Sequence, residues 1–157
     1  MNPLRPDVVF DCNVFLQAVA RVSGPAAEAL RRVERNEVTL YLSRPILREL
    51  RTVLAYPEIR EKNPHVTDPL VQEFLERITF RGVLIRDIPH VVRFPRDPHD
   101  EPYLDLVAAV QADVLVTRDR DLLDLATDHA VEAKEFRQRF PFLKVVDPVV
   151  FLRALDS

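Results

Sequence analysis

Short apolar runs alternate with stretches of helical periodicity along this chain. Residues 8–10, 38–42, 114–117 and 143–146 are almost continuously apolar, a pattern typical of strands buried in a parallel sheet. Lys144 interrupts the last run, so we expect that strand to lie near an edge of the sheet. Residues 83–85 are a candidate for one further strand.

Apolar residues at helical spacing fill the intervals between these runs. Pro25, Pro45 and Pro69 suit the first turn of a helix, and Pro57 is expected to end the second of these helices. The spacing predicts helices over residues 25–36, 45–56, 69–80, 100–111, 122–126, 132–140 and 149–155. This alternation favours an α/β fold, a three-layer α/β/α sandwich around a mainly parallel sheet, in which residues 1–157 form a single domain.

Composition limits the classes of function. The 157 residues include 22 Lys and Arg against 25 Asp and Glu, a net charge of −3, so a long electrostatic grip on nucleic acid is not expected. Any nucleic-acid role must therefore come from a local site. Cys12 is the single cysteine, which excludes an intramolecular disulfide. We see neither a leader peptide nor an apolar run of membrane-spanning length, and we expect a cytoplasmic protein.

The scarcity of glycine removes several kinds of site. Gly24 and Gly82 stand alone, so the chain has no glycine-rich phosphate loop. It also lacks a GxSxG elbow, a pair of cysteines and an HExxH zinc motif. The four histidines fall in predicted loops or turns, and we expect most of them at the surface.

Carboxylates follow two of the predicted strands. Asp11 comes directly after residues 8–10, with Asn13 two positions later. Asp119 and Asp121 follow the strand that ends at Thr117. The alternative for Asp11 and Asp119 is helix capping, a common use of aspartate. Because open parallel sheets bind ligands beyond the carboxyl ends of their strands, we instead expect these acids to share one site.

Two predicted helices supply further acids. Glu49 lies on the apolar stripe of its helix, where an unpaired carboxylate is costly; the alternative is an exposed pair with Arg48 or Arg51. Asp100 stands at a helix start and could simply cap it. Three neighbouring acids make assignment within that segment open: Asp97, Glu101 and Asp105.

Oxygen-rich clusters of this kind suit hard cations such as Mg²⁺ or Mn²⁺. A cation held by carboxylates can bind phosphate oxygens and stabilise a departing oxygen. The pattern therefore favours phosphodiester hydrolysis without an organic cofactor. Arg118 and Arg120 are candidates for phosphate contacts, and the alternative for both is an ion pair with Asp119 or Asp121.

Taken in order, these segments resemble a PIN domain. The resemblance rests on Asp11 after Val8-Val9-Phe10, on the stretch from Ser43 to Glu49-Leu50, on Asp100, and on Thr117-Arg118-Asp119 after a strand. It extends from about residue 7 to residue 155 and is strongest to the toxin components of bacterial and archaeal toxin–antitoxin systems.

The resemblance implies an endoribonuclease dependent on Mg²⁺ or Mn²⁺ that cuts single-stranded RNA. It further implies a homodimer with a small antitoxin protein as partner, and no association with a membrane. By motif, the acidic quartet is Asp11, Glu49, Asp100 and Asp119, and Asp121 could replace or assist Asp119. Three polar residues match positions that orient the carboxylates or a bound water: Asn13, Ser43 and Thr117. Cys12 stands where threonine is commoner in the family.

Two other interpretations stay open. One is a PIN-like module that binds RNA or protein without cleaving, or that serves in RNA processing. The other is an acidic-pocket phosphatase or receiver-type domain. A receiver domain needs a lysine near the last strands, and the three lysines, Lys62, Lys134 and Lys144, do not follow Thr117. A haloacid-dehalogenase-like phosphatase needs a second aspartate in its first motif, where this chain has Asn13.

Overall fold

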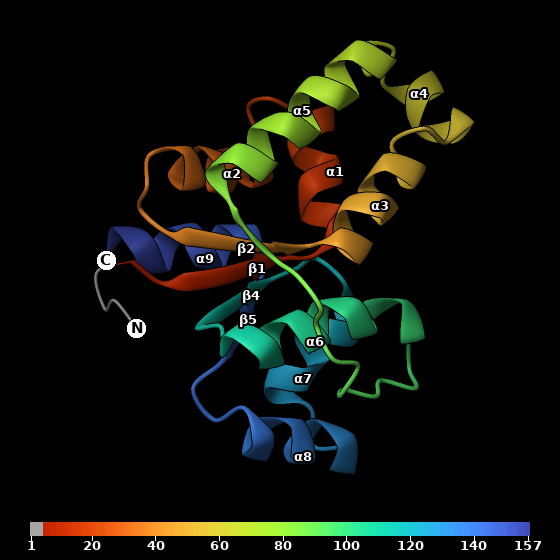
Figure 1. Cartoon of the computed structure of the whole chain (residues 1–157). Helices are drawn as coiled ribbons and strands as arrows, with labels where there is room; N and C mark the ends of the chain where they lie inside the picture. The colour runs from red at the N-terminus through yellow and green to blue at the C-terminus, as the bar shows by residue number, and fades with distance from the viewer. Residues whose placement is uncertain (1–4) are drawn as a thin grey trace.

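A computed structural model describes residues 5–157 and shows a five-stranded sheet between layers of helices (Figure 1). All strand pairs in this part of the chain are parallel, in the order β3-β2-β1-β4-β5. The strands are β1 (Asp7–Phe10), β2 (Thr39–Ser43), β3 (Val83–Ile85), β4 (Val114–Val116) and β5 (Lys144–Val146). The predicted sheet is therefore confirmed, including the strand at 83–85 and the edge position of the Lys144 strand.

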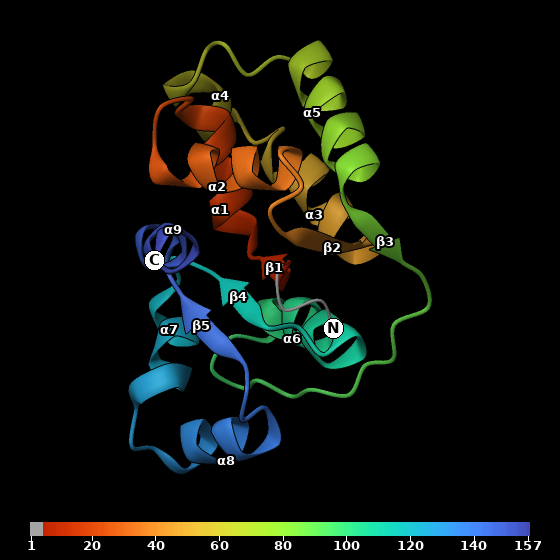
Figure 2. The same cartoon turned by 90° about the vertical axis from the view of Figure 1, so that its left-hand side faces the viewer.

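Helices cover both faces of the sheet (Figures 1 and 2). One face carries α6 (Glu101–Val110) and α7 (Arg120–Thr127), with α8 (Val131–Arg139) outside them. The other carries α1 (Cys12–Ala20), α2 (Pro25–Glu34) and α9 (Pro148–Asp156). The remaining helical segments are α3 (Arg44–Val53), α4 (Pro57–Lys62), α5 (Asp68–Arg81) and the 3₁₀ turn η1 (Pro98–Asp100). The predicted three-layer architecture is confirmed.

The clearest departure from the predicted helices lies around Pro57. The helix opened by Pro45 ends at Val53, and Pro57 begins the short helix α4. Proline fits the first helical turn because backbone N–H groups at that position have no acceptor within the helix, so nothing is lost when the N–H is absent. The predicted ranges do not include α1, which begins at Cys12 directly after β1.

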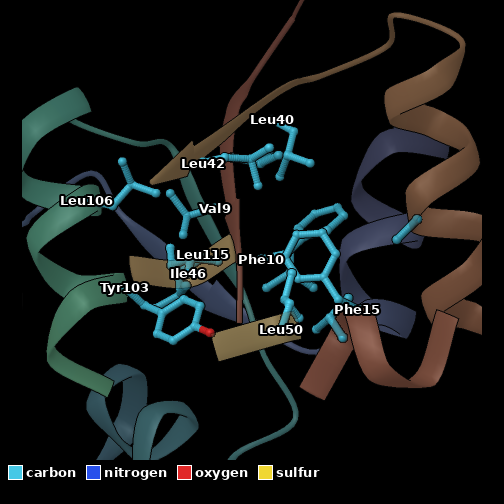
Figure 3. Packing of buried hydrophobic residues seen from close by; sticks show 14 of the residues in the cluster. Val9, Phe10, Phe15, Leu40, Leu42, Ile46, Leu50, Tyr103, Leu106 and Leu115 are labelled. Atoms are coloured by element: carbon cyan, nitrogen blue, oxygen red, sulfur yellow. The ribbon is translucent and has the colours of Figure 1, made fainter. Parts of the chain in front are cut away.

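The core holds the middle strands in fixed positions. Val9, Leu40 and Leu115 are fully buried, and Figure 3 shows them with the aromatic rings of Phe10 and Phe15. The Phe10 ring lies 5.7 Å from that of Phe15 and 5.9 Å from that of Phe151, centroid to centroid. Such packing leaves the carboxyl ends of β1 and β4 little freedom to move.

The chain leaves β1 and β4 toward opposite faces of the sheet. β1 continues into α1 on one face, whereas β4 continues into α7 on the other. The place at the carboxyl ends of two such adjacent parallel strands, called the crevice below, is where open α/β sheets bind their ligands. Within residues 5–157, no helix combines the length and the apolar character needed to cross a membrane.

Candidate metal centre

Asp11 lies at the carboxyl end of β1 and is only 3% exposed. Its backbone N–H donates to the Val116 carbonyl at 2.9 Å, which ties it to β4. Its carboxylate accepts from the Cys12 N–H and from the Thr117 hydroxyl, both at 2.7 Å. Burial, reinforced by the charges of Asp119 and Glu49, nevertheless raises the pKa of Asp11 to about 6. The capping role considered for Asp11 is also present, because its side chain caps α1.

Asp100 enters the same crevice from η1, at the start of α6. It is 6% exposed, and its Oδ2 atom has no hydrogen-bond partner among the described residues. Burial, and then the neighbouring carboxylates of Asp11 and Asp119, raise the pKa of Asp100 well above its usual range. A buried, unpartnered carboxylate oxygen is costly, so it points to a cation or a proton as its missing partner.

Asp119 completes the cluster from the turn between β4 and α7. Its N–H donates to the Thr117 hydroxyl oxygen at 3.0 Å, and its carboxylate accepts from the Asp121 N–H at 2.9 Å. One Thr117 hydroxyl thus links the carboxylate of Asp11 to the backbone of Asp119. One carboxylate oxygen from each of Asp11, Asp100 and Asp119 lies within 4.8 Å of the others.

The chemistry of this donor set suits a hard divalent cation. The three aspartates contribute carboxylate oxygens, and the nearest cysteine, Cys12, has a thiol whose pKa burial raises, which disfavours the metal-binding thiolate. Mg²⁺ and Mn²⁺ prefer such oxygen donors. A bound cation would also compensate the buried Oδ2 atom of Asp100, which has no hydrogen-bond partner among the described residues.

Glu49 lies beside this cluster but outside its closest group. It is half-buried on α3, and its Oε1 atom accepts from the Tyr103 hydroxyl at 2.6 Å. The described chain shows no ion pair between Glu49 and Arg48 or Arg51, so that alternative is wrong. Tyr103 is 1% exposed on α6, in the part of the core drawn in Figure 3. Sequence reasoning missed Tyr103, although its position three residues after Asp100 places both on one helix face.

Asp121 has a different neighbour from Asp119. Its Oδ1 atom lies 2.7 Å from the guanidinium of Arg96, which also contacts Asp124 at 3.0 Å. Asp121 can still approach Asp119 and Asp97, since one oxygen of each lies within 4.8 Å of the others. The geometry therefore groups Asp119 with Asp11 and Asp100, while Asp121 faces Arg96. Arg96 was not singled out from the sequence, where it is one of several arginines before Asp97.

The other predicted polar residues are distributed around the crevice. The Asn13 carbonyl oxygen accepts from the Arg118 N–H at 3.2 Å, and the Arg118 guanidinium donates to Gln17 at 2.7 Å. Ser43 caps α3 by accepting from the Ile46 N–H at 3.4 Å, so it acts on Glu49 only through the helix. Among the described residues, Arg118 and Arg120 form no ion pair with Asp119 or Asp121, and that alternative is wrong; both arginines are exposed.

Glu101 and Asp105 hold the backbone of residues 90–94 instead of facing the cluster. Asp105 is buried and accepts from the N–H groups of Val91 and Val92 at 2.9 and 2.8 Å. Its second oxygen lies 2.7 Å from Nδ1 of His90. Glu101 accepts from the Phe94 N–H at 2.7 Å. Of the neighbouring acids whose roles the sequence left open, these two therefore fix the connector between β3 and η1.

Comparison with known proteins gives a family for this arrangement. A family model described as PIN domain matches residues 7–121, a span that holds every carboxylate of the cluster. A search among curated proteins finds no match to the chain.

Proposed function

Since this chain belongs to the PIN domain family, whose domains are generally metal-dependent nucleases, we propose that it hydrolyses single-stranded RNA with Mg²⁺ or Mn²⁺. One observation carries the proposal: Asp11, Asp100 and Asp119 converge in the crevice, and Oδ2 of Asp100 is buried without a hydrogen-bond partner in the described part of the chain. Carboxylates crowded in this way repel one another unless a cation or a proton lies between them. RNA phosphates then meet a cation and not bare negative charge.

The residues of the crevice have different proposed roles. Asp11, Asp100 and Asp119 would hold the ion, which when bound would supply positive charge at the phosphate and acidify a bound water. Thr117 orients Asp11 through a hydroxyl bond and Asp119 through its backbone. Tyr103 orients the Glu49 carboxylate toward the same crevice. Arg118, exposed at the rim, is available to a neighbouring phosphate of the substrate.

The contacts of Glu49 and Asp121 support a more specific assignment of the metal ligands. Glu49 serves at the margin of the site, where its charge reaches Asp11. Asp119 is the fourth acid of the quartet, and Asp121 supports it from a position paired with Arg96. Arg120 is a second candidate for a phosphate contact on the same turn.

The likeness to toxin components extends the proposal to a biological role. On this proposal the protein is a cytoplasmic homodimer that a small antitoxin protein inhibits. Expression of the wild-type chain should then arrest growth, and coexpression of a small neighbouring reading frame should relieve the arrest. Asp11→Asn should be harmless without that partner, and arrest by this variant would contradict the role.

The decisive experiment measures cleavage of a labelled single-stranded RNA. We expect cleavage with Mn²⁺ or Mg²⁺, none with EDTA, and loss of activity in Asp11→Asn with an unchanged circular dichroism spectrum. Asp147→Asn is the matched control, because Asp147 also caps a helix, α9, by accepting from the Val150 N–H. Cleavage without metal, or full activity of Asp11→Asn, would refute the proposal. Tight RNA binding without cleavage would instead favour a non-catalytic module.

A further inference from the structure

A cavity of about 500 Å³ lies outside the metal centre, between the connector at residues 92–96 and the helices α6, α7 and α8. Its apolar lining includes Phe94, Leu104, Leu125, Phe136 and Phe140. Its charged residues comprise three arginines, Arg93, Arg96 and Arg139, and three acids, Asp128, Glu132 and Glu135. Clefts of this size with a few polar groups around an apolar floor are typical of sites for small organic groups.

The cavity shares Arg96 and two helices with the surroundings of the metal centre. Arg96 lines it and also contacts Asp121, whose carboxylate lies within 4.8 Å of that of Asp119. Leu104 follows Asp100 by about one turn of helix. Leu125 likewise follows Asp121 by about one turn. The cavity and the acidic cluster are therefore linked through Arg96 and lie along the same two helices.

The lining suits a nucleobase with an attached phosphate. Phe136 and Phe140 are half-buried, with ring centroids 4.9 Å apart. The Arg139 guanidinium lies 5.2 Å from the Phe140 centroid, so a stacked base would use the exposed part of Phe136. Arg93 and Arg139 are exposed beside them and can meet phosphate oxygens. An apolar peptide would instead leave these arginines without an anionic partner.

The acids at the cavity offer hydrogen-bond acceptors to a bound base. Asp128 lies 3.9 Å from Arg96, whereas Glu132 and Glu135 are exposed on α8. A carboxylate accepts hydrogen bonds, so it favours bases with adjacent N–H donors. Guanine presents an N–H and an amino group side by side, while uracil presents one N–H between two carbonyl oxygens. Guanine also offers the larger surface for stacking.

We propose that this cavity is a subsite for a nucleobase of the RNA next to the cleaved bond, with guanine preferred over uracil. The inference rests on the proposed function for the identity of the substrate. Base binding itself needs no metal, because none of the three clustered aspartates lines the cavity.

The test is a calorimetric titration with guanosine or uridine 5′-monophosphate in EDTA. Ala130→Phe fills the cavity, since Ala130 is exposed and lines it. Val131→Phe is the matched control, because Val131 is 66% exposed and is not among the lining residues. We expect the guanosine nucleotide to bind at least about 5-fold more tightly than the uridine nucleotide, and Ala130→Phe to weaken it about 10-fold or more. Val131→Phe should bind as the wild type does.

Failure of this inference is distinguishable from failure of the nuclease proposal. Asp11→Asn should abolish RNA cleavage and leave nucleotide binding in EDTA unchanged. Equal affinity for the two nucleotides, or equal binding by Ala130→Phe and Val131→Phe, would overturn the subsite even if RNA is cut. Binding of an apolar dye without either nucleotide would overturn it in favour of a protein segment. Binding that depends on Ala130 in a chain that cuts no RNA would uphold the cavity and refute only the nuclease.

Discussion

Replacing Asp100 by asparagine should stabilise the metal-free protein at pH 8, although it removes a proposed metal ligand. The Asp100 carboxylate is buried, its Oδ2 atom has no hydrogen-bond partner within residues 5–157, and Asp11 and Asp119 lie close by. Asparagine keeps the shape of the side chain and removes its charge. The stabilisation therefore comes from removing the cost of burying a charged group and from removing repulsion between carboxylates.

The structure sets the size of this effect. Two charges at the 4.8 Å limit of the cluster repel by about 3.5 kcal/mol at an effective dielectric constant of about 20. The pKa of Asp11, raised from 3.8 to about 6, corresponds to about 3 kcal/mol. Proton uptake and local relaxation reduce the net gain for Asp100→Asn to about 1–3 kcal/mol. For a chain of this length, that gain raises Tm by about 3–10 °C.

The pH dependence follows from the direction of the shift. Because the pKa of Asp100 is higher in the folded protein than in the unfolded chain, the folded state binds more protons between these two values. Its contribution to stability is therefore greatest at low pH and is lost as the pH rises toward the folded pKa. The asparagine variant escapes this loss, so the difference in Tm between variant and wild type should grow from pH 5 to pH 8.

The assay is thermal unfolding followed by circular dichroism, in EDTA and with Mn²⁺. Asp105→Asn is the matched control, because Asp105 is also 6% exposed on α6 but accepts from Val91 and Val92 and pairs with His90. That variant should lose about 1–3 kcal/mol. Mn²⁺ at about 100 times its Kd should stabilise the wild type by about 2.7 kcal/mol and leave Asp100→Asn nearly unchanged.

Three results would refute this reasoning. Asp100→Asn could melt below the wild type in EDTA at pH 8, its effect could be the same at pH 5, or Mn²⁺ could stabilise both proteins equally. The first two would show that the Asp100 charge is already compensated within the protein. The third would show that the cluster does not bind the cation.

Other substitutions test individual contacts. Tyr103→Phe removes the 2.6 Å bond to Glu49 and should cost about 1–2 kcal/mol in urea unfolding and weaken Mn²⁺ binding; an unchanged Mn²⁺ affinity would separate Glu49 from the site. Gly82→Ala places a Cβ 2.9 Å from the Ile78 carbonyl oxygen and should cost about 1–3 kcal/mol, so an unchanged urea midpoint would contradict the packing. The carboxylate of Asp105 raises the pKa of His90, so the excess Tm of wild type over His90→Gln should be largest below about pH 6.5 and vanish as the pH rises through the folded pKa. A constant difference from pH 6 to pH 9 would exclude that charge interaction.

The sequence by itself determined the layers and the carboxylates at strand ends. Continuous apolar runs identify the strands because a parallel sheet is buried on both faces. Parallel strands share one carboxyl edge, so the order of strands and acids along the chain is enough to predict Asp11 and Asp119 there. Lys144 predicted an edge strand because a charged side chain there avoids burial.

Only the tertiary structure decided which carboxylates meet. Asp97, Asp100, Glu101 and Asp105 look alike along the chain, yet Asp100 faces Asp11 and Asp119 while Asp105 binds the backbone of Val91 and Val92. Helix rotation and the path of the connector set this difference, and both depend on contacts between segments distant in sequence.

The same holds for the partners of Asp121 and Glu49. Arg96 reaches Asp121 across a separation of 25 positions, and Tyr103 reaches Glu49 across 54. Local periodicity reports which face of an element is buried. It does not report which polar group from another element will lie opposite, because the packing of whole elements fixes that position.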